Sequence, residues 1–239
     1  MAFYDNCNFD GLKFLSQLKD KPGDFISEPC AEFLSAIQQF KSLAPSRNLV
    51  VAELGIGYGA TALQVLKMLG EKDVYYCFDF EDTLQAFVED LQARDFGIKC
   101  QVVTVGNSSN LWDSYSWSLS DLVLQMREEN LCGIFDVVYL DGAHTLFHDG
   151  LAVCLLKELL KNEGVLVLDD VFWSFMNSQW RQGYGVGKLT QEQMADYQIL
   201  RVRKLFLDND PNFESLLPPD AYRGVFQKRP RLTKENNLS

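Results

Sequence analysis

The sequence lacks the features that mark membrane, secreted and nucleic-acid-binding proteins. No stretch of its 239 residues approaches the ~20 consecutive apolar residues of a membrane-spanning helix, and its start shows neither the basic residues nor the apolar stretch of a signal peptide. Positive charge is scarce, because 22 Lys and Arg stand against 33 Asp and Glu and leave a formal net charge of −11. Phosphate backbones and anionic lipids repel such a chain. We therefore expect no nucleic-acid partner, no membrane partner and a cytoplasmic location.

Cysteine and histidine are sparse as well; the cysteines are not spaced as metal ligands, and the two histidines, four positions apart, could share one face of a helix. The cysteines form no closely spaced pair, and runs such as YYCF and VCLL are typical of small buried apolar residues, so we expect reduced, mostly buried thiols. The six are Cys7, Cys30, Cys77, Cys100, Cys132 and Cys154. The two histidines, His144 and His148, have no HExxH motif around them, and we expect His148 to lie at the surface or to support another group.

Apolar runs alternate with helical patterns along most of the chain. Strands are predicted at 49–54, 74–80, 99–105, 135–140 and 165–168, with helices at 61–69, 83–94, 146–161 and, in part, 111–129. Two helices are expected over 10–43, the second with Pro29 in its first turn and Ser27 as its cap, and two closing strands at 198–207 and 222–227. This order predicts a single doubly wound, Rossmann-like α/β domain. Its mostly parallel seven-stranded sheet carries helices on both faces and ends in an antiparallel hairpin. Residues 1–45 would form N-terminal helices, 46–228 the core and 229–239 a frayed tail.

Three alternating glycines follow the first predicted strand. Gly55, Gly57 and Gly59 permit a tight turn and close approach of a ligand before a helix N-terminus. The G-x-G-x-x-G/A fingerprint of nicotinamide dinucleotides is formally met by Gly55, Gly57 and Ala60. Glu53 argues against that cofactor, because its negative charge would crowd a pyrophosphate. The same acid suits a cationic cofactor such as S-adenosylmethionine.

The ends of the next two strands supply further polar groups for a nucleoside. Asp79 is placed to accept hydrogen bonds from ribose hydroxyls in either cofactor, and Glu81 and Asp82 are nearby alternatives. After the third strand, Asn107 and Ser108 offer small polar groups where an adenine could be held. These positions agree with a bound adenosine group without deciding which cofactor carries it.

Three aspartates mark the ends of the fourth and fifth predicted strands. Asp141 follows one strand, and Asp169 and Asp170 follow the other. Carboxylates that converge repel each other unless a cation neutralises them, and oxygen ligands favour Mg²⁺, Mn²⁺ or Ca²⁺. The alternative is that one aspartate of the pair caps the following turn and faces water. His144, three residues after Asp141, is either a catalytic base or a structural histidine.

These motifs together resemble one enzyme family. The segments AELGIGYGATA, VGNSS and FDVVYLDGAH…LLKNEGVLVLDDV, with Asp79, are similar to class I S-adenosylmethionine-dependent methyltransferases, and among them to the metal-dependent O-methyltransferases of the catechol and macrocin (antibiotic-sugar) types. The resemblance places Glu53, Gly55, Gly57, Asp79 and Ser108 at the cofactor site. It places Asp141, Asp169 and Asp170 at the metal. His144 stands where catechol-type enzymes carry a lysine base, and Asp170 stands where they carry an amide but the macrocin type carries aspartate. The aromatic segment 171–197 matches nothing we can assign.

The sequence therefore predicts a Mg²⁺-dependent O-methyltransferase with a small-molecule hydroxyl as acceptor. The metal is expected to bind and acidify that hydroxyl, and the neutral imidazole of His144 to accept its proton, with Asp141 also part of the catalytic site. A sugar or sugar conjugate is the acceptor we favour, followed by a catechol-like phenol. A nicotinamide-dependent oxidoreductase and a cofactor-binding module without catalysis are the alternatives. Homo-oligomer formation is left open.

Overall fold

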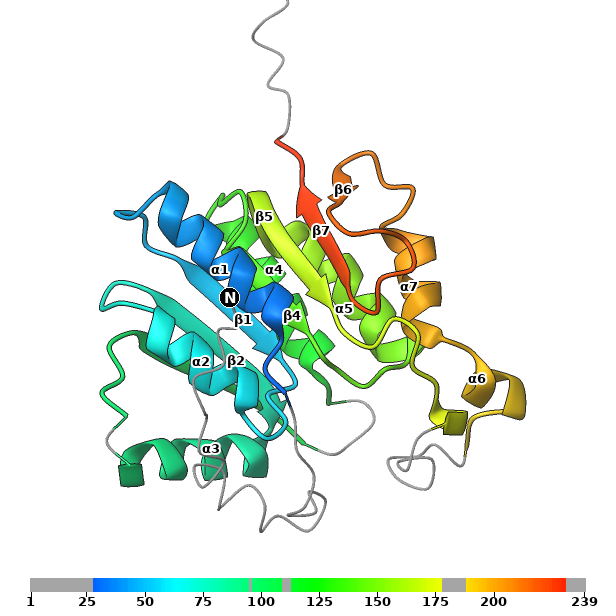
Figure 1. Ribbon diagram of the computed structural model, residues 1–239, viewed down its shortest axis with the longest axis horizontal. Coiled ribbons are helices and arrows are strands. Elements are labelled where there is room, and N and C mark those ends of the chain that lie inside the picture. Colours follow the sequence, from blue (N-terminus) through cyan, green and yellow to red (C-terminus); the bar gives the residue numbers. More distant parts are fainter. Residues whose placement is uncertain (1–27, 95, 109–112, 178–187, 231–239) are drawn as a thin grey trace, which may run out of the picture.

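The computed structural model describes residues 28–94, 96–108, 113–177 and 188–230. Its strands form one seven-stranded sheet in the order β3-β2-β1-β4-β5-β7-β6 (Figure 1). The first five strands run parallel, and β7 pairs antiparallel with both β5 and β6. The strands are β1 (Val50–Leu54), β2 (Val74–Phe80), β3 (Gln101–Asn107), β4 (Phe135–Leu140), β5 (Leu160–Leu168), β6 (Phe213–Ser215) and β7 (Gly224–Lys228). The predicted α/β class with an antiparallel closing hairpin is confirmed.

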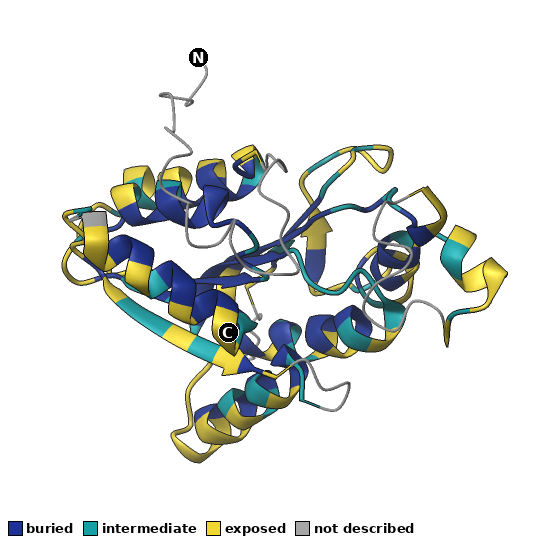
Figure 2. Cartoon of the chain, turned by 90° about the horizontal axis from the view of Figure 1, so that it is seen from below, coloured by how far each residue is buried: buried dark blue, intermediate teal, exposed yellow. Residues whose placement is uncertain are grey.

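Helices cover both faces of this sheet. The helices are α1 (Ala31–Leu43), α2 (Ala60–Met68), α3 (Glu81–Arg94), α4 (Tyr115–Glu128), α5 (Leu146–Leu159), α6 (Gln191–Ala195) and α7 (Gln198–Phe206), with a short 3₁₀ turn, η3 (Phe175–Asn177). Helices α1 to α3 pack on one face of the sheet, and α4, α5 and α7 pack on the other. In Figure 1, α1 lies in front of the strands and α5 behind them. In Figure 2 the buried parts of the larger helices lie on the side of the sheet and their exposed parts on the outer side. None of the described helices is long and apolar enough to span a bilayer.

The central strands are apolar because both of their faces are covered. Every residue of β4 is buried. Successive residues point to opposite faces, so Val137 and Tyr139 join the core under α1 to α3, while Val138 and Leu140 join the core under α4, α5 and α7. The strand order reverses between β1 and β4, which are neighbours. That reversal is the place where doubly wound sheets bind ligands at the carboxyl ends of their strands.

One predicted strand is wrong. Residues 198–207 form the helix α7 rather than a strand, and the true partner of β7 is the three-residue strand β6. Ile199 and Val202 are buried three residues apart, and they pack with Leu156 of α5 in one core. That spacing matches one face of a helix, whereas the alternation of Leu200 and Val202 is what suggested a strand in the sequence.

Several boundaries also differ from the prediction. Pro29 precedes α1, which begins at Ala31 with Cys30 as its N-cap, so it does not lie in the first helical turn. β5 begins at Leu160, where α5 has just ended, five residues before the predicted start. The predicted cap Ser27, the helix expected before it, Cys7 and the tail from residue 231 lie outside the described residues. Among the described cysteines, all free, three are buried (Cys30, Cys77 and Cys100) and two are exposed (Cys132 and Cys154).

Candidate functional site

The glycine turn links β1 to α2, and its three glycines have left-handed backbones. The φ angles of Gly55, Gly57 and Gly59 are +87°, +52° and +74°. At Gly55 a Cβ would lie 1.9 Å from the Asp141 carbonyl oxygen, so this glycine lets the ends of β1 and β4 meet. At Gly57 a Cβ would meet nothing within 4 Å. The turn therefore has no room for a side chain at Gly55, but open space at Gly57, where a ligand can approach the backbone.

Glu53 lies beneath this turn, on β1. Its carboxylate is 1% exposed and accepts a hydrogen bond from the Tyr75 hydroxyl. The pKa of Glu53 is raised to about 8, chiefly by burial and also by the charge of Asp79, while the hydrogen bond from Tyr75 opposes the rise. Such a group is largely protonated at neutral pH unless a cation approaches it.

Asp79 and Asn107 lie at the ends of β2 and β3, one register step apart. Asp79 accepts hydrogen bonds from the backbone N–H groups of Gly57 (3.0 Å) and Phe80 (2.6 Å), which ties the end of β2 to the glycine turn. The amide nitrogen of Asn107 is buried and has no hydrogen-bond partner among the described residues. A buried unpaired donor is costly, so a ligand that accepts from it would be stabilised here. The Ser108 N–H donates to Asp113 at 2.7 Å.

The predicted acid–histidine cluster is assembled at the ends of β4 and β5. The Nε2 atom of His144 lies 3.4 Å from Asp141 Oδ1 and 3.7 Å from Asp170 Oδ2. One ligand atom from each of the three residues falls within 4.8 Å of the others. His144 and Asp170 both have positive φ angles of 53°. Non-glycine residues adopt that backbone only uncommonly, although aspartate and histidine do so more often than most, and here the surrounding contacts support it.

Asp169 belongs to the same cluster but is engaged differently. Its Oδ1 accepts from Arg223 Nε at 2.8 Å and from the Asp170 N–H at 2.9 Å, and its Oδ2 accepts from the Tyr139 hydroxyl. Arg223 also donates to Glu32, at the start of α1, at 3.1 Å. Asp169 is thus anchored within the protein, while Asp141 and Asp170 face His144. No sequence pattern marked Arg223 or Tyr139, whose roles depend on contacts between distant segments.

Crowding of negative charge is the main electrostatic feature of the cluster. Burial and the nearby charges of Asp169 and Asp170 raise the pKa of Asp141 well above its usual value. Burial also raises the pKa of Asp170, although His144 opposes the rise. Carboxylates in this state bind a proton or a cation more readily than they remain as free anions. The arrangement can hold a divalent cation and places an imidazole beside it.

Aromatic side chains border the cluster. The rings of His144 and Trp173 are 4.9 Å apart, and Phe175 contacts Trp173 edge-on at 4.6 Å. The Tyr222 hydroxyl donates to Asp170 Oδ1. His148 lies apart from these groups, in the first turn of α5, with its Nδ1 2.8 Å from the Thr145 hydroxyl. Of the predicted aromatic segment 171–197, residues 178–187 lie outside the described chain.

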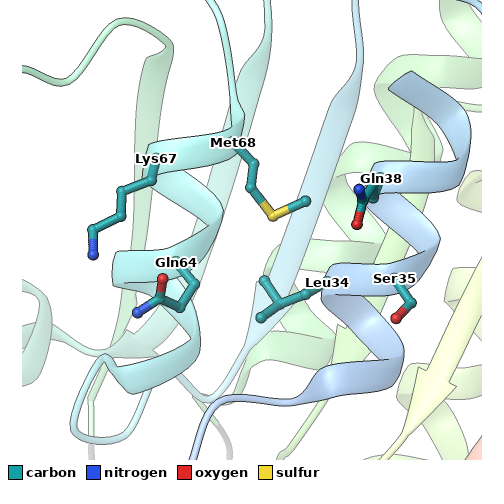
Figure 3. Close-up of a pocket in the computed structure, with 6 residues that line it drawn as sticks. All are labelled: Leu34, Ser35, Gln38, Gln64, Lys67 and Met68. Atoms are coloured by element: carbon teal, nitrogen blue, oxygen red, sulfur yellow. The ribbon is translucent and has the colours of Figure 1, made fainter. Parts of the chain in front are cut away.

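A small pocket also lies between α1 and α2 (Figure 3). Leu34 of α1 and Met68 of α2 point toward each other across it, and Lys67 extends away from α1. The remaining lining residues are Ser35, Gln38 and Gln64. The lining contains no acid and no histidine, so this pocket carries none of the chemistry described above.

Comparisons with known proteins agree with this fold. The chain is similar in structure to the O-methyltransferase TomG of Streptomyces achromogenes in complex with S-adenosylmethionine (13% identity, 95% of this chain and 92% of that chain, TM-score 0.56). It is also similar to an O-methyltransferase of Bacillus cereus in complex with S-adenosylhomocysteine (13% identity, 91% of this chain and 89% of that chain, TM-score 0.51). The chain is also similar in structure to the methyltransferase MycE from the mycinamycin biosynthetic pathway, in complex with Mg and S-adenosylhomocysteine. The identity is 17%, the match covers 92% of this chain and 53% of that chain, and the TM-score is 0.52. A comparison with curated protein sequences gives no match.

A family profile decides the assignment. The profile described as a methyltransferase domain matches residues 52–171, which is half of the chain and runs from the glycine turn to just past Asp170. The predicted choice of a methyltransferase over a nicotinamide-dependent oxidoreductase is thereby confirmed. The chain belongs to the methyltransferase-domain family, and it is a class I S-adenosylmethionine-dependent methyltransferase.

Proposed function

We propose that this methyltransferase acts on a hydroxyl group of a small molecule with the help of a divalent cation. The observation that carries the proposal is the meeting of Asp141, Asp170 and His144 directly beside the glycine turn. The structural similarity to two O-methyltransferases, and to the methyltransferase MycE in complex with Mg, supports it. When bound, S-adenosylmethionine supplies the methyl group and the cation supplies Lewis-acid activation of the acceptor hydroxyl.

The cofactor would lie across the ends of β1, β2 and β3. The open space at Gly57 and the unpaired Asn107 amide nitrogen are what a bound nucleoside would use. Asp79 would accept from ribose hydroxyls, and Glu53 would favour the positive charge of the donor. The full set that we propose for the cofactor is Glu53, Gly55, Gly57, Gly59, Asp79, Asn107 and Ser108.

The cation would be held chiefly by Asp141 and Asp170. Their raised pKa values and close approach are the mark of carboxylates that lack a neutralising charge. Asp169 stays a predicted third ligand, although its oxygens already accept hydrogen bonds from Arg223, Tyr139 and the Asp170 N–H. Magnesium is the metal that we propose, because carboxylate oxygens are its preferred protein ligands.

His144 would act as the general base. An imidazole with an unperturbed pKa of ~6.5 can accept a proton near neutral pH, and proximity to the acceptor hydroxyl is the geometric requirement. The contact with Trp173 limits the rotation of the ring, and Asp141 and Asp170 lie within 4 Å of its Nε2. The chain would therefore contribute a proton acceptor held beside the two carboxylates that are proposed to bind the cation.

The acceptor that we favour is a sugar or sugar conjugate, with a catechol-like phenol as the alternative. The paired Asp169 and Asp170 of the macrocin type support the sugar. Trp173 and Tyr222 at the site suit either ring, because an aromatic face can stack on a sugar or on a phenol. The cytoplasmic location remains a prediction, and homo-oligomer formation stays open.

A transfer assay tests the proposed function. The purified chain is incubated with a labelled methyl donor and separate pools of sugars, sugar nucleotides and catechols, with Mg²⁺ or with excess EDTA. We expect label in one hydroxyl-containing pool only when Mg²⁺ is present. Full activity in EDTA would overturn the role of the metal, and transfer only to nitrogen or carbon acceptors would overturn O-methylation.

A further inference from the structure

The loop that carries Asp141 and His144 is held by buried side chains from three helices. The Ala143 N–H donates to the Tyr115 hydroxyl of α4 at 3.2 Å, and the Thr145 N–H donates to Asp149 Oδ2 of α5 at 2.8 Å. The N–H of Leu146, the next residue along, donates to Gln198 of α7 at 2.9 Å. The Asp141 N–H is bound by the Leu54 carbonyl of β1 at 2.9 Å, and beyond Asp141 side chains hold these three N–H groups of the loop.

Tyr115 and Asp149 form the centre of this arrangement. The Tyr115 hydroxyl donates to Asp149 Oδ1 at 2.6 Å, while the Asp149 carboxylate is fully buried and the tyrosine is 8% exposed. A buried carboxylate is costly unless its oxygens are hydrogen-bonded, and here both oxygens accept. The pair is therefore a rigid polar contact inside the otherwise apolar core between the sheet and α4, α5 and α7.

Gly142 shows how closely this pair approaches the loop. A Cβ at Gly142 would lie 2.3 Å from Asp149 Oδ1 and 2.6 Å from the Tyr115 hydroxyl. Unlike Gly55 and Gly57, Gly142 is not among the residues with a positive φ angle, so space rather than backbone freedom requires glycine here. The glycine that follows Asp141 in the motif DGAH is thus explained by packing against Tyr115 and Asp149.

We propose that Tyr115 and Asp149 are positioning residues for the reaction. They fix the loop so that His144 keeps its left-handed backbone, its ring lies against Trp173, and its Nε2 faces Asp141 and Asp170. Groups that orient the residues of a site are commonly as important as the residues themselves, because a small displacement removes the productive geometry. The inference rests on the proposed roles of Asp141 and His144.

The position of the His144 ring can be measured without metal, cofactor or acceptor. The sequence has only two histidines, so an NMR spectrum of imidazoles labelled with ¹³C at Cε1 contains one signal from each. A His148→Gln variant assigns them. The Trp173 ring shifts the His144 signal away from its random-coil position. In Tyr115→Phe and in Asp149→Asn we expect this signal to move toward the random-coil position and to broaden.

Two variants serve as controls. Tyr76→Phe removes a hydroxyl from a partly buried tyrosine of β2, which packs against Phe78 and Phe135. Asp136→Asn removes a buried carboxylate of β4 that pairs with Arg47 and Lys161 at the other end of the strand. Neither should move the His144 signal, even where Asp136→Asn lowers stability. Unfolding midpoints in urea, measured for every variant, separate lost stability from lost position.

A third test variant decides the question if Tyr115→Phe or Asp149→Asn fails to fold. Gly142→Ala forces Tyr115 and Asp149 away from the loop without removing a hydrogen-bonding group, and it should move the His144 signal in the same direction. An unchanged His144 signal in every variant that folds would overturn the inference. So would an equal change in Asp136→Asn.

Metal and cofactor affinities extend the test to the proposed function. Mn²⁺ binding, followed by electron paramagnetic resonance, should weaken about 10–100-fold in Tyr115→Phe, as is usual for groups that orient metal ligands. The affinity for S-adenosylhomocysteine, measured by calorimetry, should stay within about threefold of the wild type, since that site lies on other strands. A wild type that binds no Mn²⁺ would contradict the metal part of the proposed function, and the His144 signal would still decide the positioning roles.

Discussion

Replacing Arg223 with alanine should destabilise the protein, because this arginine balances the buried charge of Asp169. Its Nε lies 2.8 Å from Asp169 Oδ1, and the two side chains are 22% and 10% exposed. Removal of one partner from a buried ion pair costs about 3–5 kcal/mol, since the other charge stays buried. Asp169 keeps its bonds from Tyr139 and the Asp170 N–H, so we expect the low end of that range, about 3 kcal/mol.

A double-mutant cycle in urea measures the pair itself. Arg223→Ala and Asp169→Asn should each lower the free energy of unfolding, and the double variant should lose less than the sum by about 1–3 kcal/mol. Arg223→Lys should rescue only in part, because one amino group cannot replace the two separate donors that contact Asp169 and Glu32.

The control for this cycle is an exposed pair. Arg201 lies 2.6 Å from Asp196, but the two side chains are 50% and 32% exposed, so Arg201→Ala should change the free energy of unfolding very little. If the losses in free energy of unfolding from Arg223→Ala and Asp169→Asn simply add, the two side chains do not stabilise each other. A loss from Arg223→Ala no larger than that from Arg201→Ala would also refute the claim that Arg223 balances a buried charge.

Four further predictions concern the cofactor, the metal and the base. The pKa of Glu53 is about 8 in the folded chain against 4.5 ordinarily, so the folded state holds this proton more tightly and stability falls as the pH rises through that interval. Glu53→Gln should flatten that fall, and urea midpoints that keep the wild-type slope between pH 5 and pH 8 would contradict it. Gly57→Val should abolish binding of S-adenosylhomocysteine in calorimetry, because its side chain would fill the open space at the turn and strain a backbone of φ +52°; unchanged affinity would place the cofactor elsewhere. Asp141→Asn should abolish turnover with cofactor binding nearly intact, and Mg²⁺ should restore only a chelated wild type; turnover that persists in the variant would remove Asp141 from the site. His144→Ala should lower kcat by ~10²–10⁴-fold at unchanged cofactor affinity, whereas a raised KM with normal kcat would mean that His144 only orients the acceptor.

The fold was largely predictable because its strands are short apolar runs between glycine-containing turns. The central strands β1 and β4 bury both faces, so their composition differs clearly from that of the helices around them. Residues 198–207 were predicted wrongly because the apolar residues of QILRVRKLF fit a helix nearly as well as a strand. Packing of Val202 against α5 decides for the helix. The true edge strand, Phe213–Ser215, is too short to leave a pattern.

The predicted site residues were recognisable because a topological rule gathers them. Ligands bind where parallel strands end, and Asp79, Asp141 and Asp169 each follow such an end or close a strand. The groups that hold these residues were not recognisable. Arg223 contacts Glu32 across 191 positions of sequence, and Asp149 is an acid inside a helix that nothing in the local pattern distinguishes from a surface residue. Long-range contacts of this kind become visible only in the folded chain.

The charges of the cluster bear on the proposed divalent cation. Asp169 is balanced by Arg223, and Glu32, which shares that arginine, is 32% exposed and partly solvated. Glu53, with a pKa of about 8, is largely neutral at pH 7. The carboxylates of Asp141 and Asp170 face His144, and burial and neighbouring carboxylates raise the pKa values of both. A divalent cation between them would stabilise their ionised forms, which is the role that the proposed function gives to the metal. Under that proposal Arg223 would stabilise Asp169, the cation would stabilise Asp141 and Asp170, and His144 would accept the proton of the acceptor hydroxyl.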